Sequence, residues 1–253
     1  MTKLTFLGTG TSQGVPMIGC GCDVCRSSDP RDKRLRASVL VEHEGLTILV
    51  DAGPDFRQQM LRADVSHVDA ILLTHNHKDH TGGLDDIRAF NYLENKASQI
   101  YCEQYVEDAL RMEYSYAFAE KKYPGAPEWD VHIIDEKPFS INGVEIIPIR
   151  GMHYKLPVLG YRFGNIAYCT DMNHIPEEEF AKLQGLDHFV INCVKYGKHI
   201  SHYSLEEAVA VAQRVGAKHS WLTHLSHRLP CYEALAAELP AGILPAYDGL
   251  ILE

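Results

Sequence analysis

Four side chains that can bind metal ions lie within six residues of one another, directly after an apolar run. They are His75, His77, Asp79 and His80. Residues 70–73 before them are typical of a short buried strand, and Gly82 and Gly83 after them predict a turn that leads into a helix. A loop at the carboxyl end of a strand is where open α/β sheets build their sites. Imidazole and carboxylate groups suit zinc, manganese or iron, and four of them this close together can serve two neighbouring ions.

The His-x-His-x-Asp-His spacing of residues 75–80 resembles the signature of the metallo-β-lactamase-fold hydrolases. Other positions of that signature are also present in the chain, each at the end of a predicted strand. They are Asp51, His153, Asp171 and His224. The resemblance implies an α/β fold with four layers, an αβ/βα sandwich in which helices flank two mixed sheets. Because no linker or charge block divides the 253 residues, one hydrolase domain over residues 1–253 is expected.

The same resemblance implies a role for each of these side chains. One metal ion is expected on His75, His77 and His153. The second ion is expected on Asp79, His80 and His224. Asp171 is expected to bridge the two ions, Asp51 to support the metal loop, and Asp79 to take part in catalysis as well. The implied cofactors are two divalent ions, manganese or zinc.

Three thiols, those of Cys20, Cys22 and Cys25, lie within six residues in a Gly-rich loop. Packing explains such a cluster poorly, whereas closed structural zinc sites take three thiolates and one histidine. Free thiols are the alternative. His227 is the expected fourth ligand, because it follows His224 by three residues and the pattern resembles the PhnP branch of the family, the phosphoribosyl cyclic phosphodiesterases, at all four positions.

A histidine close to a predicted helix start is the expected proton donor. Ser204 is a plausible N-cap, and Glu207 completes a capping box for a helix that reaches Val215. His202 stands just ahead of this cap and has no evident packing role. In the PhnP and RNA-processing branches of the superfamily, a His-x-Ser/Thr at the matching place supplies the general acid. The resemblance therefore implies that role for His202, with His199 as the competitor.

Composition limits the partners and the compartment. The chain has 24 Lys and Arg against 34 Asp and Glu, a net charge of −10, which disfavours a large nucleic-acid partner. No apolar stretch approaches the ~20 residues of a membrane span, so no membrane partner is expected. Seven cysteines without an export signal indicate a reducing compartment, and the cytoplasm is the expected location.

Three further segments carry expectations. Residues 8–16 form a Gly-rich loop, read either as a tight turn or as a wall of the site. Residues 31–36 read as an exposed basic linker, and residues 176–183 as a helix. Residues 103–119 read as one long helix, for which ordinary packing against a sheet is favoured. Because the region up to residue 127 is rich in aromatic residues, two alternatives remain: a lid over the metals, or a homodimer interface.

The expected activity is hydrolysis of a small phosphodiester, with a cyclic ribose phosphate as one such substrate. A metal-bound hydroxide would attack phosphorus while His202 protonates the leaving group. Three rivals share parts of this pattern. A tRNA 3′-processing endonuclease should carry a basic arm, which the sequence does not show. A glyoxalase-type thioesterase explains neither the thiols nor His202, and an accessory protein of pyrroloquinoline-quinone biosynthesis would not need the complete metal set.

Overall fold

The computed structural model describes residues 2–253, which form two sheets of seven strands each. The first sheet consists of β1 (Thr2–Gly8), β2 (Ser38–His43), β3 (Leu46–Val50), β4 (Ala70–Leu72), β5 (Ser98–Cys102), β6 (Trp129–Ile133) and β14 (Ile251–Leu252). The second consists of β7 (Phe139–Ile141), β8 (Val144–His153), β9 (Leu156–Phe163), β10 (Ile166–Cys169), β11 (His188–Asn192), β12 (His219–Thr223) and β13 (Ile243–Pro245). The strand orders are β14-β1-β2-β3-β4-β5-β6 and β13-β12-β11-β10-β9-β8-β7.

Both sheets are mixed in the same way, because antiparallel strands at one side give way to parallel strands at the other. The pairs β1–β2 and β2–β3 are antiparallel, and β3 to β6 are parallel. In the second sheet, β7 to β10 are antiparallel and β10 to β13 are parallel. Parallel strands end at a common edge, so each sheet gathers loops there.

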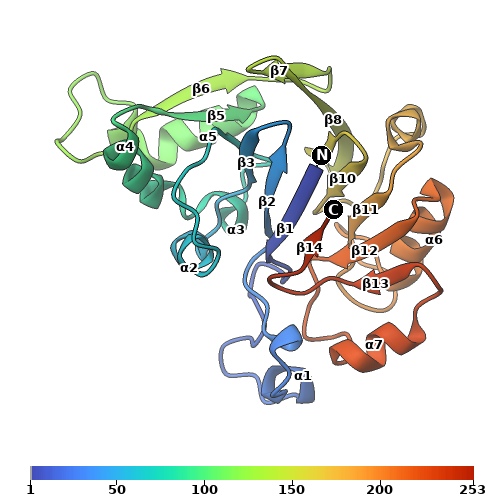
Figure 1. Cartoon of the computed structure of the whole chain (residues 1–253). Coiled ribbons are helices and arrows are strands. Elements are labelled where there is room, and N and C mark those ends of the chain that lie inside the picture. The colour runs from blue at the N-terminus through green and yellow to red at the C-terminus, as the bar shows by residue number, and fades with distance from the viewer. Residues whose placement is uncertain (1) are drawn as a thin grey trace.

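Helices cover the outer faces of both sheets, which gives the predicted four-layer αβ/βα sandwich (Figure 1). The α-helices are α1 (Asp23–Arg26), α2 (Phe56–Arg62), α3 (Lys78–Thr81), α4 (Arg88–Glu94), α5 (Gln104–Glu113), α6 (Leu205–Val215) and α7 (Tyr232–Glu238). Short 3₁₀ helices are η1 (Pro30–Asp32), η2 (Leu84–Ile87), η3 (Ser115–Ala117) and η4 (Glu177–Leu183). Among the described residues, no helix has both the length and the apolar character that crossing a membrane requires.

The apolar residues of each strand divide between two layers of core. On β3, Ile48 and Val50 pack between the two sheets, whereas Leu49 packs under the helices of the first sheet. Such a strand is buried on both faces, which explains its unbroken apolar run. On α5, Val106 and Leu110 are fully buried in that same outer layer, so the helix packs against the sheet as favoured.

Two expectations about local structure are wrong, and one is confirmed with a different type of helix. The helix predicted over residues 103–119 ends at Glu113, because Tyr114 turns inward, packs on Trp129 and donates a hydrogen bond to the Thr81 carbonyl. The helix predicted over residues 176–183 is present, as a 3₁₀ helix over Glu177–Leu183. The basic stretch of residues 31–36 is not an exposed linker, since Arg34 is only 5% exposed and donates to Thr9 Oγ1 and the Ala246 carbonyl.

Candidate metal centre

The metal-binding residues predicted from separate parts of the chain meet where strands of the two sheets end. His153 is the last residue of β8, and His224 directly follows β12. Asp171 lies two residues after β10, and His75 lies three residues after β4. Each side chain is therefore held by a buried strand, which fixes its position more firmly than a free loop would.

Three of these strand ends carry backbone strain. Asp51, Asp171 and His224 all have positive φ angles, of 64°, 57° and 54°. A side chain in this left-handed region costs on the order of 1–3 kcal/mol, and such residues cluster at functional sites.

Asp171 lies at the centre of the cluster and is only 2% exposed. One oxygen, Oδ2, lies 3.1 Å from His80 Nε2 and 3.2 Å from His224 Nδ1. Ligand atoms of Asp79, His80, Asp171 and His224 all lie within 4.8 Å of one another. These residues include the complete set predicted for the second ion and the predicted bridge.

The histidines predicted for the first ion form an adjoining group. The ring of His75 lies 4.6 Å from that of His77 and 5.6 Å from that of His153, between centroids. His77 and His153 are 5.0 Å apart by the same measure. His153 also shares a 4.8 Å cluster with Asp171, so the two groups adjoin at the predicted bridging carboxylate.

Four buried ring nitrogens in this centre have no hydrogen-bond partner. They are His75 Nε2, His80 Nε2, His153 Nδ1 and His224 Nδ1. Two of them lie within ion-pair distance of Asp171, but without the geometry of a hydrogen bond. An unsatisfied buried polar atom costs roughly 1–3 kcal/mol, so four in one place call for a ligand. Imidazole nitrogens gathered around two carboxylates are a ligand set that fits divalent cations.

The electrostatics of the centre agree with this fit. Burial lowers the pKa of His75 well below its usual range and that of His224 to about 4, so both rings are neutral and able to bind a metal. Burial also disfavours a charge on His80, but three surrounding carboxylates raise its pKa well above the usual range. A proton on His80 thus supplies positive charge that a bound ion would otherwise provide.

Asp51, for which the resemblance implies a supporting role, contacts the loop that carries His75 to His80. It is fully buried, and Oδ2 lies 2.6 Å from His80 Nδ1. The backbone N–H and the hydroxyl of Thr74 both donate to the same carboxylate at 2.9 Å. By accepting from Nδ1 of His80, Asp51 leaves Nε2 free to face the metal centre.

The second predicted metal site also comes together. Cys20 Sγ and Cys22 Sγ lie 3.2 and 3.5 Å from His227 Nδ1, and all four predicted ligands lie within 4.8 Å of one another. The backbone N–H of Cys25, and then His227, lower the pKa of Cys22 to about 6. The thiolate is the form that binds zinc, and three thiols with one imidazole fit a closed zinc site.

His202 lies beside the metal centre, two residues before Ser204, the predicted N-cap of α6. The Ser204 and Glu207 capping box is present at the start of α6. Nε2 of His202 lies 3.0 Å from Asp171 Oδ1, and the ring stacks on that of His224 with centroids 5.0 Å apart. This nitrogen can therefore reach an atom that is bound at the metal centre.

A cavity of about 360 Å³ joins the two predicted metal sites. His202 and His224 line one part of it and His227 lines another. Residues 11–13 of the Gly-rich loop form a wall of it, which agrees with one of the two readings of that loop. The cavity also contains Lys195 and Arg228, which the sequence did not single out because no motif marks them.

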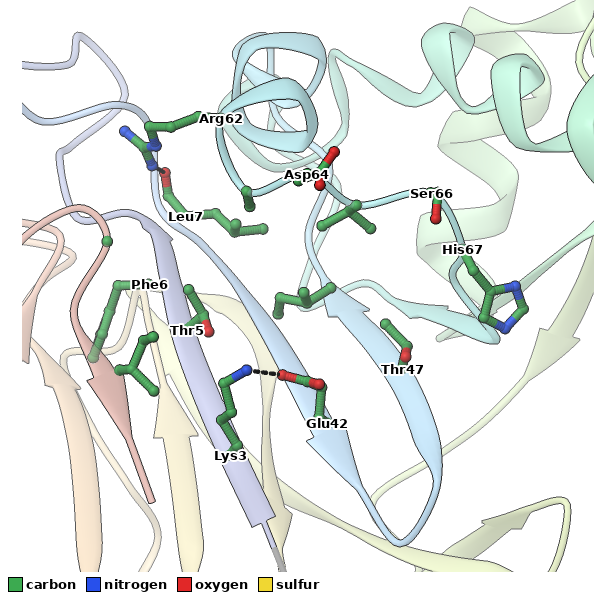
Figure 2. A pocket seen from close by; sticks show the side chains of 15 residues that line it. Lys3, Thr5, Phe6, Leu7, Glu42, Thr47, Arg62, Asp64, Ser66 and His67 are labelled. Atoms are coloured by element: carbon green, nitrogen blue, oxygen red, sulfur yellow. Dashed lines mark hydrogen bonds and ion pairs between the residues drawn. The ribbon is translucent and has the colours of Figure 1, made fainter.

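A larger cavity, of about 500 Å³, lies on the outer face of the first sheet, beside β1, β2 and the segment that follows α2 (Figure 2). Its charged groups are mostly paired with neighbours. Lys3 pairs with Glu42, as Figure 2 shows, and Arg62 pairs with Asp248 at 3.2 Å. None of the predicted metal-binding or catalytic residues lines it, so we place the functional site in the smaller cavity.

Comparison with known proteins identifies the family. Residues 47–225 match the family described as "Beta-lactamase superfamily domain". The chain is 43% identical over 251 residues to an octanoyltransferase from Porphyromonas gingivalis, a match that covers 98% of this chain and 51% of that protein. It is 29% identical over 156 residues to coenzyme PQQ synthesis protein B from Methylococcus capsulatus, covering 56% of this chain and 50% of that one. The chain thus spans about half the length of these curated relatives.

Two solved structures share the fold. One, described as a new diphosphatase from the PhnP family, has a TM-score of 0.93 and 39% identity over 99% of this chain and 96% of that one. The other, zinc-bound PqqB from Methylobacterium extorquens, has a TM-score of 0.80 and 18% identity, and covers 99% of both chains. The chain therefore belongs to the beta-lactamase superfamily, has the metallo-β-lactamase fold and is similar to a solved member of the PhnP family.

Proposed function

We propose that this protein is a metal-dependent phosphodiesterase that hydrolyses a small substrate, such as a cyclic ribose phosphate. The observation that carries the proposal is the placement of His202, whose Nε2 lies 3.0 Å from the carboxylate shared by the two histidine groups. A proton donor at this place serves a reaction in which a strongly basic oxygen departs. A phosphodiester with an alkyl or ribosyl leaving group is such a substrate.

The residues proposed to hold two divalent ions, manganese or zinc, surround Asp171. They are His75, His77, His153, Asp79, His80, Asp171 and His224. When bound, two such ions lower the pKa of a water molecule and hold a phosphoryl oxygen. Cys20, Cys22, Cys25 and His227 are proposed to hold a structural zinc ion.

The chain's own residues supply the remaining functions. Asp171 holds His202 by its Nε2, the nitrogen that gives its proton to the leaving oxygen as the phosphorus–oxygen bond breaks. Lys195 and Arg228 make the cavity locally cationic in a chain of net charge −10, which favours entry of an anionic substrate. The cavity volume of about 360 Å³ suits a small molecule.

A diphosphate is the second candidate substrate, because the solved relative at 39% identity is described as a diphosphatase. The departing group would then be a phosphate, which is a weaker base than an alkoxide. Such a reaction would depend less on His202. The dependence on His202 therefore distinguishes the two candidates.

The rival activities have less support. The net charge of −10 disfavours a precursor tRNA as substrate. The thiolate that leaves a thioester is a weaker base than an alkoxide, so such a reaction would need a proton from His202 less. The similarity to PQQ synthesis protein B covers 56% of the chain. The name octanoyltransferase belongs to a relative of which this chain spans about half, so it does not say which half transfers the acyl group.

The test is a substrate panel with protein loaded with manganese or zinc. It contains ribose 1,2-cyclic phosphate, bis-p-nitrophenyl phosphate, inorganic diphosphate, precursor tRNA and a glutathione thioester. We expect the highest kcat/KM on the cyclic phosphate, and loss of that activity in His77→Ala. A preference for the thioester or the tRNA would overturn the proposal, and a preference for diphosphate would favour the second candidate.

A further inference from the structure

His199 lies next to the proposed proton donor but outside the metal centre. It lines the same cavity, and no metal cluster within residues 2–253 includes it. Its ring centroid lies 5.0 Å from that of His202. Two histidines in contact, of which only one reaches the metal-binding carboxylate, suggest a division of roles.

The hydrogen bonds of His199 determine which of its nitrogens carries a proton. The backbone N–H of Ser201 points at His199 Nδ1, 3.3 Å away. A backbone amide nitrogen only donates, so this Nδ1 must present a lone pair. Burial, and then the nearby positive charges of His202, Lys195 and Arg228, lower the pKa of His199. The ring is therefore neutral at pH 7 and carries its single proton on Nε2.

The same lone pair faces His202. Nδ1 of His202 lies 3.2 Å from Nδ1 of His199 and 3.1 Å from the Ser201 hydroxyl oxygen. Two lone pairs pointing at one another over this distance would repel. Nδ1 of His202 must then carry a proton, which it donates to His199 and shares with Ser201.

We infer that His199 is a positioning residue, which holds the Nδ1–H of His202 and thereby aims the Nε2–H of that ring at the departing oxygen of the substrate. The inference rests on the proposed function. In the reaction, the phosphorus–oxygen bond breaks, its electron pair stays on the leaving oxygen, and that oxygen takes the proton from Nε2. His202 is left neutral, with its remaining proton on Nδ1 still bonded to His199.

This arrangement also argues against His199 as the proton donor itself. Its Nδ1 already accepts from Ser201 and His202, so its single proton lies on Nε2, and among residues 2–253 no predicted metal ligand hydrogen-bonds to the His199 ring. His202 instead presents Nε2 within 3.0 Å of the metal-binding Asp171. The two histidines thus act in series.

The first test needs no activity. Protein labelled with nitrogen-15 histidine is examined metal-free at pH 7 by NMR, which separates protonated from unprotonated ring nitrogens, and signals are assigned through His199→Gln and His202→Ala. We expect a protonated Nδ1 on His202 and an unprotonated Nδ1 on His199. In His199→Gln, Nδ1 of His202 should lose this acceptor and become less protonated. An unprotonated Nδ1 on His202 in the wild-type protein would overturn the inference, whatever the substrate is.

The second test compares His199→Asn with His199→Gln, whose side-chain amides lie at different distances from the backbone. The amide of Asn matches the place of Nδ1, and that of Gln matches the place of Nε2. On an alkyl or ribosyl diester, His199→Gln and His199→Ala should lower kcat roughly 10–100-fold with little change in KM, and His199→Asn should recover much of the loss. His199→Ala combined with His202→Ala should be no slower than His202→Ala alone. Additive losses, or equal rates for Asn and Gln, would show that His199 does not act through His202.

Discussion

Replacement of Asp51 by Asn tests the role of Asp51 in preparing His80, a proposed metal ligand, to bind an ion. The carboxylate accepts three hydrogen bonds, from the Thr74 N–H, the Thr74 hydroxyl and His80 Nδ1. An amide retains one oxygen and presents an NH₂ group in place of the other. If the oxygen keeps the Thr74 N–H, the NH₂ faces His80 Nδ1, which must then give up its proton. A neutral His80 would carry that proton on Nε2, the nitrogen that faces the metal centre.

The expected result is a loss of metal affinity without a matching loss of fold. Partners that orient a metal ligand are worth about 10–100-fold in affinity, or roughly 1.4–2.8 kcal/mol. The stability of the metal-free protein should change less, because the lost hydrogen bonds are offset by removal of a buried charge whose pKa burial already raises. Manganese binding is measured by competition with a chelator, and metal-free stability by thermal unfolding.

Asp69→Asn is the matched control for this change. Asp69 also binds a histidine and a backbone N–H, since it lies 3.0 Å from His67 Nε2 and accepts from the Thr47 amide at 2.8 Å, but it lies outside the metal centre. The control should bind manganese as the wild-type protein does. Wild-type affinity in Asp51→Asn, or an equal loss in Asp69→Asn, would refute the role assigned to Asp51.

Three further predictions concern the metals and thiols. Fully loaded protein should contain close to three ions per chain, one of them resistant to mild chelation, because thiolates hold zinc tightly; two or fewer ions by elemental analysis, with freely alkylated Cys20, Cys22 and Cys25, would contradict this. Cys22→Ser should lower both melting temperature and turnover, because His227 and His224 share one short loop, whereas Cys231→Ser should change turnover little; unchanged turnover in folded Cys22→Ser would rule the coupling out. In zinc-free protein, mass spectrometry should find Cys22 alkylated rapidly down to about pH 6, where its thiolate protonates, whereas Cys25, whose pKa burial raises to about 11, should react slowly at pH 8.

The sequence predicted those metal-binding residues that lie close in the chain to a recognisable strand. The spacing of residues 75–80 and the apolar strands before Asp171 and His224 placed metal-binding groups at strand ends, and the chain does bring them together. A short buried strand followed by polar side chains can be recognised from about ten consecutive residues, so no distant contact has to be known.

The features that the sequence did not predict depend on distant contacts. Arg34 is buried because its guanidinium meets the Ala246 carbonyl, 212 residues away along the chain. The helix ends before Tyr114 because the Tyr114 ring packs on Trp129 and its hydroxyl donates to the Thr81 carbonyl. The helical periodicity of the sequence does not predict these contacts. Lys195 and Arg228 meet in one cavity only after the second sheet has formed. Propensity is a weak guide where tertiary packing decides the conformation.

The most direct test of the proposed chemistry compares two leaving groups in one variant. Without its proton donor, the enzyme should lose most on substrates whose departing oxygen is strongly basic, where a general acid is worth about 10²–10⁴-fold. For fully metallated His202→Ala, kcat/KM on an alkyl or ribosyl diester should therefore fall by about this factor, and kcat/KM on a p-nitrophenyl diester should fall far less, whereas His77→Ala should depress both. Equal losses on the two substrates in His202→Ala would contradict the account, because His202 would then only position the phosphate.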